Sequence, residues 1–429
     1  MQRVRAASDA LRTSFFFLPA IAVVVGFLGA RLLVGVEVGE WVGRSTVDSA
    51  RAVLSTTAAA TITFASITFS VSLLIMQQGS SQFSPRVIHG LVRDPFNRRV
   101  IAIVVGTFTY CLVSLQRVRG PVAEGGEEVV PEFAVTVGVV LGVVAVLAVV
   151  AAINHTSHKM DVSVILGDIV ERATGVPTSP DTDKDLRAAT QTDRSIPDGE
   201  PVTVVRFDGD GWVRQIDRRG LLGLVDSGSI VRLEIDAGRY AIRSTPFCSI
   251  WPAVTEARLD EVSRSAKRCV VLGPTRTMNE DAGYGVRQLV DVALRALSPG
   301  VNDPTTAQDA IFHLGTVLVD RLLSSPVPTA LVDGSGRCLL ALHALTDEDI
   351  AELAFAELRR AGAGQPAVTV YLLQSIALVA DAARANGAAD RVAPFVAQAR
   401  LLLDNVDAAD LIEHDRVSVR HSYHALFGN

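Results

Sequence analysis

Apolar residues are distributed unevenly along this 429-residue chain. Long apolar runs fill the chain to about residue 152, whereas charged side chains recur every few positions from His155 onward. Only a helix satisfies its own backbone in hydrocarbon, and about 20 mainly apolar residues cross a core of about 30 Å. Four runs meet this requirement and are predicted to be transmembrane helices, at residues 14–36, 53–76, 100–115 and 133–153.

The second apolar run differs from the others because small polar side chains interrupt it throughout. At about 100° per residue, one set of side chains falls on one helix face: Thr56, Thr63, Ser66, Ser70, Gln77 and Ser81. A second set falls on nearly the opposite face: Thr57, Thr61, Thr68 and Ser72. One interpretation is a tightly packed central helix, since small residues permit close helix contact. The other is that one face packs within the subunit and the opposite face lines a pore.

The remaining chain predicts a globular part with both helices and strands. A helical stem and a Pro-rich polar linker occupy residues 154–201, a β-rich barrel or sandwich occupies 202–252, and an α-dominated unit occupies 253–429. Residues 368–380 are apolar as well, but the run is short and polar residues flank it, which predicts a buried amphipathic helix rather than a fifth span. The predicted fold class is therefore an α-helical membrane protein with four transmembrane helices and a C-terminal α+β soluble domain.

Alternating and apolar segments bounded by turn residues predict strands at 202–207, 212–217, 230–235, 240–243, 269–272, 330–332 and 338–342. Helical periodicity predicts helices at 281–297, 304–323, 347–361, 368–386 and 390–403.

The distribution of arginine predicts the orientation in the membrane. Basic residues of short loops remain on the cytoplasmic side, and they are most frequent before the first run and between the second and third runs. Four spans then return the chain to the cytoplasm. We expect a multi-pass protein of the bacterial inner (plasma) membrane, with both termini cytoplasmic and the lipid bilayer as its surroundings. The first run lacks a small-residue cleavage motif, so it should remain as a signal anchor.

Charge and motif content narrow the function. The net charge of −6, without a run of Lys and Arg in the soluble part, disfavours nucleic acid as a partner. The four cysteines are scattered without CxxC spacing, and neither HExxH nor a GK[ST] phosphate loop occurs. We therefore expect no metal site, no cofactor and no catalytic constellation. No Asp, Glu, Lys or His lies in the middle of a predicted span, which favours passive conduction over ion-driven transport.

The segment RALSPGVNDPTTA, residues 295–307, is the most distinctive motif of the soluble part. Asp303 before Pro304 is typical of a helix N-cap followed by proline at the first helical position. A helix-loop-helix corner explains this pattern. Alternatively, the amides of the helix start bind a small anion or nucleotide phosphate, with these candidate residues: Arg287, Arg295, Asn302, Asp303 and Thr305.

Three segments together resemble a known family. They are QQGSSQFSPR at residues 77–86, VGTFTY at 105–110 and YGVRQLVDVALRALSPGVNDP at 284–304. This combination looks like the bacterial predicted-membrane-protein family designated domain of unknown function (DUF) 2254, and the similarity covers most of the chain. The resemblance implies an integral membrane protein and implies no activity, substrate or catalytic residue.

Two functions follow as hypotheses. The first is a homo-oligomeric channel or passive solute or ion pathway, lined by the second transmembrane helix and gated by the cytoplasmic domain. The alternative is a membrane-anchored sensor or scaffold whose cytoplasmic domain binds a small anion, a nucleotide or a protein partner.

Overall fold

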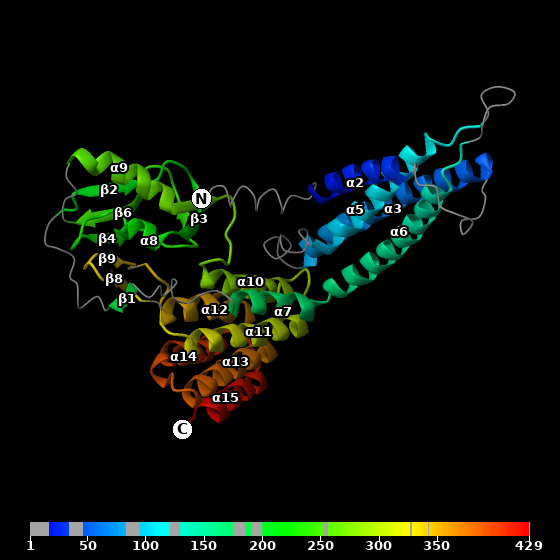
Figure 1. Cartoon of the computed structure of the whole chain (residues 1–429). Coiled ribbons are helices and arrows are strands. Elements are labelled where there is room, and N and C mark those ends of the chain that lie inside the picture. Colours follow the sequence, from blue (N-terminus) through cyan, green and yellow to red (C-terminus); the bar gives the residue numbers. More distant parts are fainter. Residues whose placement is uncertain are drawn as a thin grey trace. The chain divides into compact units, whose positions relative to one another are not determined.

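A computed structural model describes residues 17–33, 46–82, 95–120, 129–174, 186–189, 200–251, 256–326, 328–341 and 343–428. The chain forms two compact units: an N-terminal bundle, Met1–Val164, and a C-terminal unit, Ile165–Asn429 (Figure 1). The described helices of the N-terminal bundle are α2 (Phe17–Leu33), α3 (Val47–Gln82), α5 (Pro95–Leu115) and α6 (Glu132–Lys159).

Helix α5 is the centre of the N-terminal bundle. It packs against α2, α3 and α6, and its buried residues, including Val100, Ile101 and Tyr110, point in several directions. Helix α3 lies at the periphery and packs against α5 and α6. The second apolar run packs closely, as one interpretation predicts, but it does not take the central place among the described helices of the bundle. The third run takes that place, because its small and apolar side chains are buried on several sides.

Glycine allows the helices of the bundle to approach closely. A Cβ atom on Gly26 of α2 would lie 2.5 Å from the carbonyl oxygen of Gly106 in α5. Between α3 and α6, a Cβ on Gly142 would lie 2.8 Å from a methyl carbon of Thr57. Lipid tails are as apolar as the helices, so close van der Waals contact through small residues drives their association. The glycines therefore fix where the helices cross.

Four described helices are long and apolar enough to cross a membrane: Val47–Leu74 within α3, α5, α6 and α13 (Pro366–Ala385). Helix α2 is apolar and has 17 described residues. Helix α13 lies in the C-terminal unit, where Leu372 and Ile376 are fully buried and the Ser375 hydroxyl donates to the Ile311 carbonyl at 3.1 Å. These contacts place α13 in the core of that unit, as its flanking polar residues predict.

The fourth apolar helix ends instead of continuing as an unbroken stem. Helix α6 ends at Lys159, and α7 (Val162–Thr174) begins after two intervening residues. The backbone N–H groups of Met160 and Asp161 donate to carbonyls of the last turn of α6, while the Asp161 carboxylate accepts the N–H of Ser163 at 2.9 Å. A turn and a cap thus separate α6 from α7, which corrects the predicted continuous stem.

A six-stranded mixed sheet forms much of the C-terminal unit, in the order β1-β8-β9-β4-β6-β2. Neighbouring strands are antiparallel except β9 and β4, which are parallel. The strands are β1 (Leu186–Ala189), β2 (Thr203–Arg206), β4 (Ile230–Leu233), β6 (Pro246–Trp251), β8 (Ala330–Asp333) and β9 (Cys338–Leu340). The sheet is not confined to residues 202–252: β8 and β9 come from the predicted α-dominated unit, and β1 comes from the predicted linker.

A second, three-stranded antiparallel sheet has the order β5-β3-β7, with β3 (Gly211–Ile216), β5 (Tyr240–Ala241) and β7 (Val270–Gly273). Side chains of both sheets share one core with α8 (Arg218–Leu222) and α9 (Glu256–Ala266). Phe247, fully buried, and Val213 belong to this core.

The remaining helices pack against one another. They are α10 (Ala282–Ala296), α11 (Pro304–Leu323), α12 (Asp347–Gly362), α13, α14 (Ala393–Ala408) and α15 (Glu413–Phe427). The five helices predicted in this part of the chain are confirmed, and α15 is an additional helix. Thr346 and Asp349 form a capping box at the start of α12, which fixes where that helix begins. Together, the apolar helices and this mixed C-terminal unit give an α-helical membrane fold with an α+β part.

Candidate functional site

Helix α3 is longer than a membrane requires. Its 36 residues span about 54 Å at a rise of about 1.5 Å per residue, against about 30 Å of hydrocarbon. The apolar part of this helix ends at Leu74, and Gln77 follows one turn later. The part of the helix that carries Thr56 to Ser72 therefore belongs to the hydrocarbon region, and Gln77 lies toward one end.

The inward face of α3, which carries Thr57, Thr61, Thr68 and Ser72, packs within the bundle. Thr61 is 1% exposed and Thr68 is 8% exposed. Their hydroxyls donate to carbonyls of their own helix: Thr61 to Thr57 at 3.0 Å and Thr68 to Phe64 at 2.8 Å. Ser72 donates to the Thr68 carbonyl at 2.8 Å. Each buried hydroxyl is thus satisfied locally, which makes this face compatible with an apolar environment.

The outward face of α3 carries the predicted pore-lining residues. Five of them are exposed: Thr56, Thr63, Ser66, Ser70 and Gln77. The side chain of the sixth candidate, Ser81, lies outside the described residues. The Thr63 hydroxyl donates to the Ala59 carbonyl at 3.0 Å, whereas the side-chain hydroxyls of Ser66 and Ser70 make no hydrogen bond among the described residues. One of the two predicted faces is therefore packed within the bundle and the other is exposed on its surface. That the exposed face lines a pore stays a prediction.

Large apolar side chains border this outward face. Ile62 and Leu73 lie on one side and Ile67 and Leu74 on the other, by helix geometry, and they are 52%, 57%, 42% and 61% exposed. The exposed surfaces of α2 and α6 have another composition, because valine, leucine and isoleucine dominate them, as at Val24, Leu32, Val143 and Leu147. The outward face of α3 is thus a polar strip on an otherwise apolar bundle surface.

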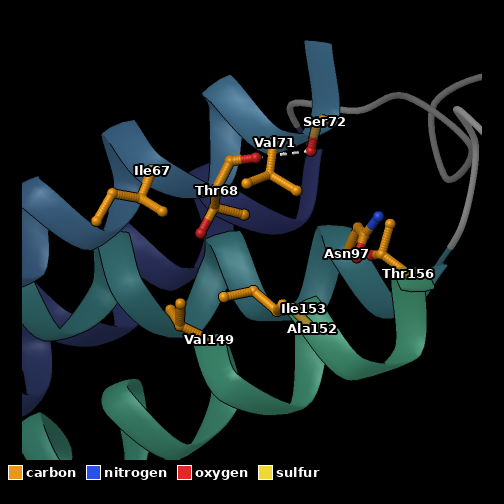
Figure 2. Close-up of a pocket in the computed structure, with 9 residues that line it drawn as sticks. All are labelled: Ile67, Thr68, Val71, Ser72, Asn97, Val149, Ala152, Ile153 and Thr156. Carbon is orange, nitrogen blue, oxygen red and sulfur yellow. Dashed lines mark hydrogen bonds between the residues drawn. The ribbon is translucent and has the colours of Figure 1, made fainter. Parts of the chain in front are cut away.

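A small cavity lies behind the inward face, between α3, α5 and α6 (Figure 2). Its polar lining comes from Thr68 and Ser72 of α3, Asn97 of α5 and Thr156 of α6. The side-chain oxygen of Asn97 is buried and has no hydrogen-bond partner among the described residues. The space is large and polar enough for about one water molecule, which needs two to four polar partners. The cavity thus suits a solvent molecule better than a substrate.

Sequence reasoning missed Asn97 because it began the third span at residue 100. The helix begins at Pro95. Proline is frequent at the first position of a helix, so Pro95 could have indicated that Asn97, two residues later, lies in the first turn.

The predicted anion site is only partly assembled. Asn302, Asp303 and Thr305 meet at the start of α11, where Asn302 has a φ of 49°. The Asp303 carboxylate accepts the Thr306 N–H at 3.1 Å and the Thr306 hydroxyl at 2.7 Å, and the hydrogen bond from the Thr306 side chain leads the contacts that lower the pKa of Asp303. A carboxylate of this chain therefore already occupies the positive end of the helix.

Arg287, one of the two basic candidates of that site, is already bound by two carboxylates of this chain. Its guanidinium binds Asp291 at 2.7 Å and the Glu357 carboxylate of α12. The hydrogen bond with Glu357 is the largest cause that raises the pKa of Arg287. Arg295 is exposed on α10. The geometry therefore favours the helix-loop-helix corner at Asp303 and joins Arg287 to helix packing.

A charged cluster between the three-stranded sheet and α10 was also missed by sequence reasoning. The Arg276 guanidinium lies 5.4 Å from the centroid of the Trp212 ring and 5.0 Å from that of Tyr284, and it binds Asp281 at 2.7 Å. Burial raises the pKa of Asp281, and Arg276 opposes this shift. A Cβ on Gly238, where φ is +83°, would lie 2.3 Å from the Asp281 carboxylate. No local spacing reveals this cluster, because the fold brings its members together.

A neighbouring cluster has the same character. Arg218 binds Asp236 at 3.0 Å and Glu280 at 2.8 Å, and Glu280 also accepts the N–H of Ile216 at 3.3 Å. Burial raises the pKa of Glu280. Because each of these carboxylates has a basic partner, the clusters hold elements together and present no unpartnered acid or base.

The described part of the chain contains neither a metal-ion site nor a reactive thiol. No group of three or more His, Cys, Asp or Glu residues there is placed to hold a metal ion. Burial raises the pKa of the Cys248 thiol to about 12 and that of Cys269 to about 11, so neither is a ready thiolate.

Comparison with known proteins agrees with the apolar bundle. The family model described as predicted membrane protein (DUF2254) matches residues 12–377. The chain belongs to this family. The match spans both units of the DUF2254 chain, from α2 into α13, so family membership includes the C-terminal unit as well as the bundle.

Two relatives of this DUF2254 protein are uncharacterized proteins of Mycobacterium bovis and Mycobacterium tuberculosis. Each is 29% identical over 398 residues, which cover 89% of this chain and 74% of the relative. No solved structure matches the chain. The protein is thus a member of a family of predicted membrane proteins with bacterial relatives.

Proposed function

We propose that this protein forms a homo-oligomer in which the outward faces of α3 from several copies line a narrow polar pathway. The observation that carries this proposal is the polar strip of Thr56, Thr63, Ser66 and Ser70 on an otherwise apolar bundle surface. Hydroxyls that face lipid gain only bonds to their own helix, whereas small polar residues at a helix interface permit close contact and hydrogen bonding between helices. Such residues also serve as the hydrogen-bonding lining of pores.

Passive conduction of ions or small solutes suits this lining. The described apolar part of α3 between Leu54 and Leu74 contains no charged side chain. The pathway would therefore be lined by hydroxyl groups and would contain no titratable group that could relay protons. The C-terminal unit, which follows α6 after a two-residue turn, would gate the pathway through α7.

The orientation belongs to the same proposal. Arg99 and Lys159 lie at one end of the bundle, at the start of α5 and the end of α6. In the sequence, the segment that joins the second and third runs carries further arginines. By the positive-inside rule this end faces the cytoplasm of a bacterial inner membrane, together with both termini.

The sensor or scaffold alternative has weaker support. It needs basic groups near the start of α11, but Arg287 is engaged by Asp291 and Glu357 and Asp303 caps its own helix. A small anion would have to displace these contacts.

Flux from proteoliposomes tests the pathway. Purified protein reconstituted in liposomes should release entrapped ions or small solutes, and the double variant Thr63→Leu with Ser70→Leu should slow release about tenfold, which is about 1.4 kcal/mol of added barrier. The matched control is Ile67→Leu, an exposed apolar residue bordering the outward face, which should conduct as the wild type does. Liposomes that remain impermeable with folded protein would reject the proposal.

Cross-linking tests the oligomer separately. Ser66→Cys places a thiol on the outward face of α3, and a short bifunctional thiol reagent should join two copies in the membrane. Val144→Cys on α6, which is 41% exposed before substitution, is the control and should remain monomeric on a denaturing gel. Equal cross-linking of both variants would contradict an interface centred on α3.

A further inference from the structure

One end of the N-terminal bundle brings basic side chains of α5 and α6 together. The ring of Phe96, in the first turn of α5, lies tilted against the ring of His155, in the last turns of α6, with a centroid distance of 4.5 Å and an interplanar angle of 37°. This contact fixes the register of the two antiparallel helix ends. Residues one turn from either ring are therefore brought to the same region of the bundle surface.

Basic side chains lie on the helix turns that neighbour this ring pair. Arg99 follows Phe96 by three residues, and Lys159 follows His155 by four, so each lies on the same helix face as the ring that precedes it. Arg99 and His158 are exposed. His158 directs its Nδ1 to the Asn154 carbonyl at 2.9 Å, which leaves Nε2 at the outer edge of the ring. We name Arg99, His155, His158 and Lys159 the basic rim.

Apolar side chains lie directly below the basic rim, toward the middle of the bundle. Ile103, one turn after Arg99, is 37% exposed. On the face of α6 that carries His155, Ala151, one turn before it, is exposed, and Val144, two turns further toward the middle, is 41% exposed. A surface with cations above and aliphatic side chains below matches a molecule with a phosphate headgroup and acyl chains.

We propose that the basic rim binds the phosphate of an anionic phospholipid, whose acyl chains lie along the exposed apolar surface of α5 and α6. Arg99 and Lys159 are long enough to extend from their different depths to one headgroup level. Basic clusters beside transmembrane helices attract anionic lipid. Asp161, the carboxylate that follows α6, is occupied by the N–H of Ser163. The lipid is favoured over free phosphate because the apolar surface continues below the cations.

This site is independent of conduction by α3, and its test measures lipid binding instead of flux. Full-length protein in detergent is titrated with phosphatidylglycerol, and bound lipid is counted by native mass spectrometry. The double variant Arg99→Gln with Lys159→Gln should bind about 25-fold more weakly, because each basic side chain near an anionic headgroup contributes about 1 kcal/mol, or about fivefold. Each single variant should show about fivefold weaker binding, and the singles carry the test if the double variant does not fold.

Three controls make the outcome decisive. The variant Arg117→Gln with Arg119→Gln removes two exposed arginines beyond the other end of α5 and should bind phosphatidylglycerol as the wild type does. Arg99→Lys with Lys159→Arg keeps the charge and should also bind. Phosphatidylcholine with the same acyl chains should bind more weakly than phosphatidylglycerol. Unchanged affinity in the Gln variants, equal affinity for both lipids, or displacement of phosphatidylglycerol by millimolar inorganic phosphate would each overturn the proposal.

Discussion

The two units satisfy their buried polar groups in different ways. In the N-terminal bundle, most threonine hydroxyls turn back to carbonyls of their own helix, as Thr68 does to Phe64 at 2.8 Å and Thr107 to Ile103 at 2.8 Å, although the Tyr110 hydroxyl donates to the Ala134 carbonyl of α6 at 3.0 Å. In the C-terminal unit, buried groups bond to partners far along the chain, as Ser375 does to the Ile311 carbonyl. Its arginines form ion pairs across helices, as Arg391 does with Asp347 at 2.7 Å.

This difference follows from the solvent that each unit is suited to. Hydrocarbon offers no hydrogen bond to a polar group that loses its partner, so a local partner within one helix is the safest arrangement. In water the unfolded chain remains solvated, and partners that meet only after folding are tolerated. The comparison therefore predicts that single side chains matter most in the C-terminal unit, whereas backbone contacts matter most in the bundle.

Removal of Arg391 should have the largest effect. Its guanidinium binds Asp347 at 2.7 Å through two nitrogens and donates to the carbonyls of Leu322 and Ser324, also at 2.7 Å. Arg391→Ala leaves Asp347 and the end of α11 without these partners, so the free energy of unfolding should fall by about 3 to 5 kcal/mol. Denaturant unfolding followed by tryptophan fluorescence measures it.

Arg384 provides the matched control. It pairs with Asp381 at 3.0 Å, but the two side chains are 51% and 74% exposed. Arg384→Ala should therefore cost less than about 0.5 kcal/mol. Equal losses in the two arginine variants would remove the distinction between buried and surface pairs in this unit.

Substitution of Gly26 tests the backbone contacts of the bundle. A Cβ on Gly26 meets the carbonyl oxygen of Gly106 at 2.5 Å, and backbone cannot move aside as a side chain does. Gly26→Val should destabilise the α2–α5 contact by about 1 to 3 kcal/mol, seen as a lower midpoint of thermal unfolding in detergent. Gly29→Val is the control on the same helix, because a Cβ there meets nothing within 4 Å. A loss shared by both variants would indicate a general effect of valine instead.

Removal of the Asp303 cap should have the smallest effect and should depend on pH. Asp303→Ala removes the side chain that accepts the Thr306 N–H, at a cost of about 1 kcal/mol. The contacts with Thr306 lower the pKa of Asp303 in the folded protein, so its stabilisation is present above the unfolded carboxyl pKa of about 3.9 and is lost as the pH falls through the lower folded value.

Unfolding of the wild type and Asp303→Ala at several pH values measures this change. The difference in unfolding free energy should be full at pH 7 and should narrow below about pH 4. A difference that stays constant to about pH 2 would show that the charge of Asp303 contributes nothing to the cap.

In the C-terminal unit, local sequence patterns predicted the helices better than the strands and their pairing. Most of its helices were predictable because apolar periodicity and caps mark them, as at Asp303 before α11. Strand β6 was missed because Phe247 to Trp251 are all buried and show no alternation. The membership of β8 and β9 in the six-stranded sheet was missed as well, because the parallel pairing of β9 with β4 joins residues more than a hundred positions apart.

The sequence by itself determined the apolar helices, the two opposed faces of α3 and the caps of the C-terminal helices. Each of these depends on residues a few positions apart, and helix geometry turns such spacing directly into structure. Only the tertiary structure decided that α5 is central, that the Thr61 face of α3 is the packed one, and that Arg287 pairs with Glu357. These features depend on which helices meet, and that choice follows from shape and close contact between distant segments, which no local pattern encodes.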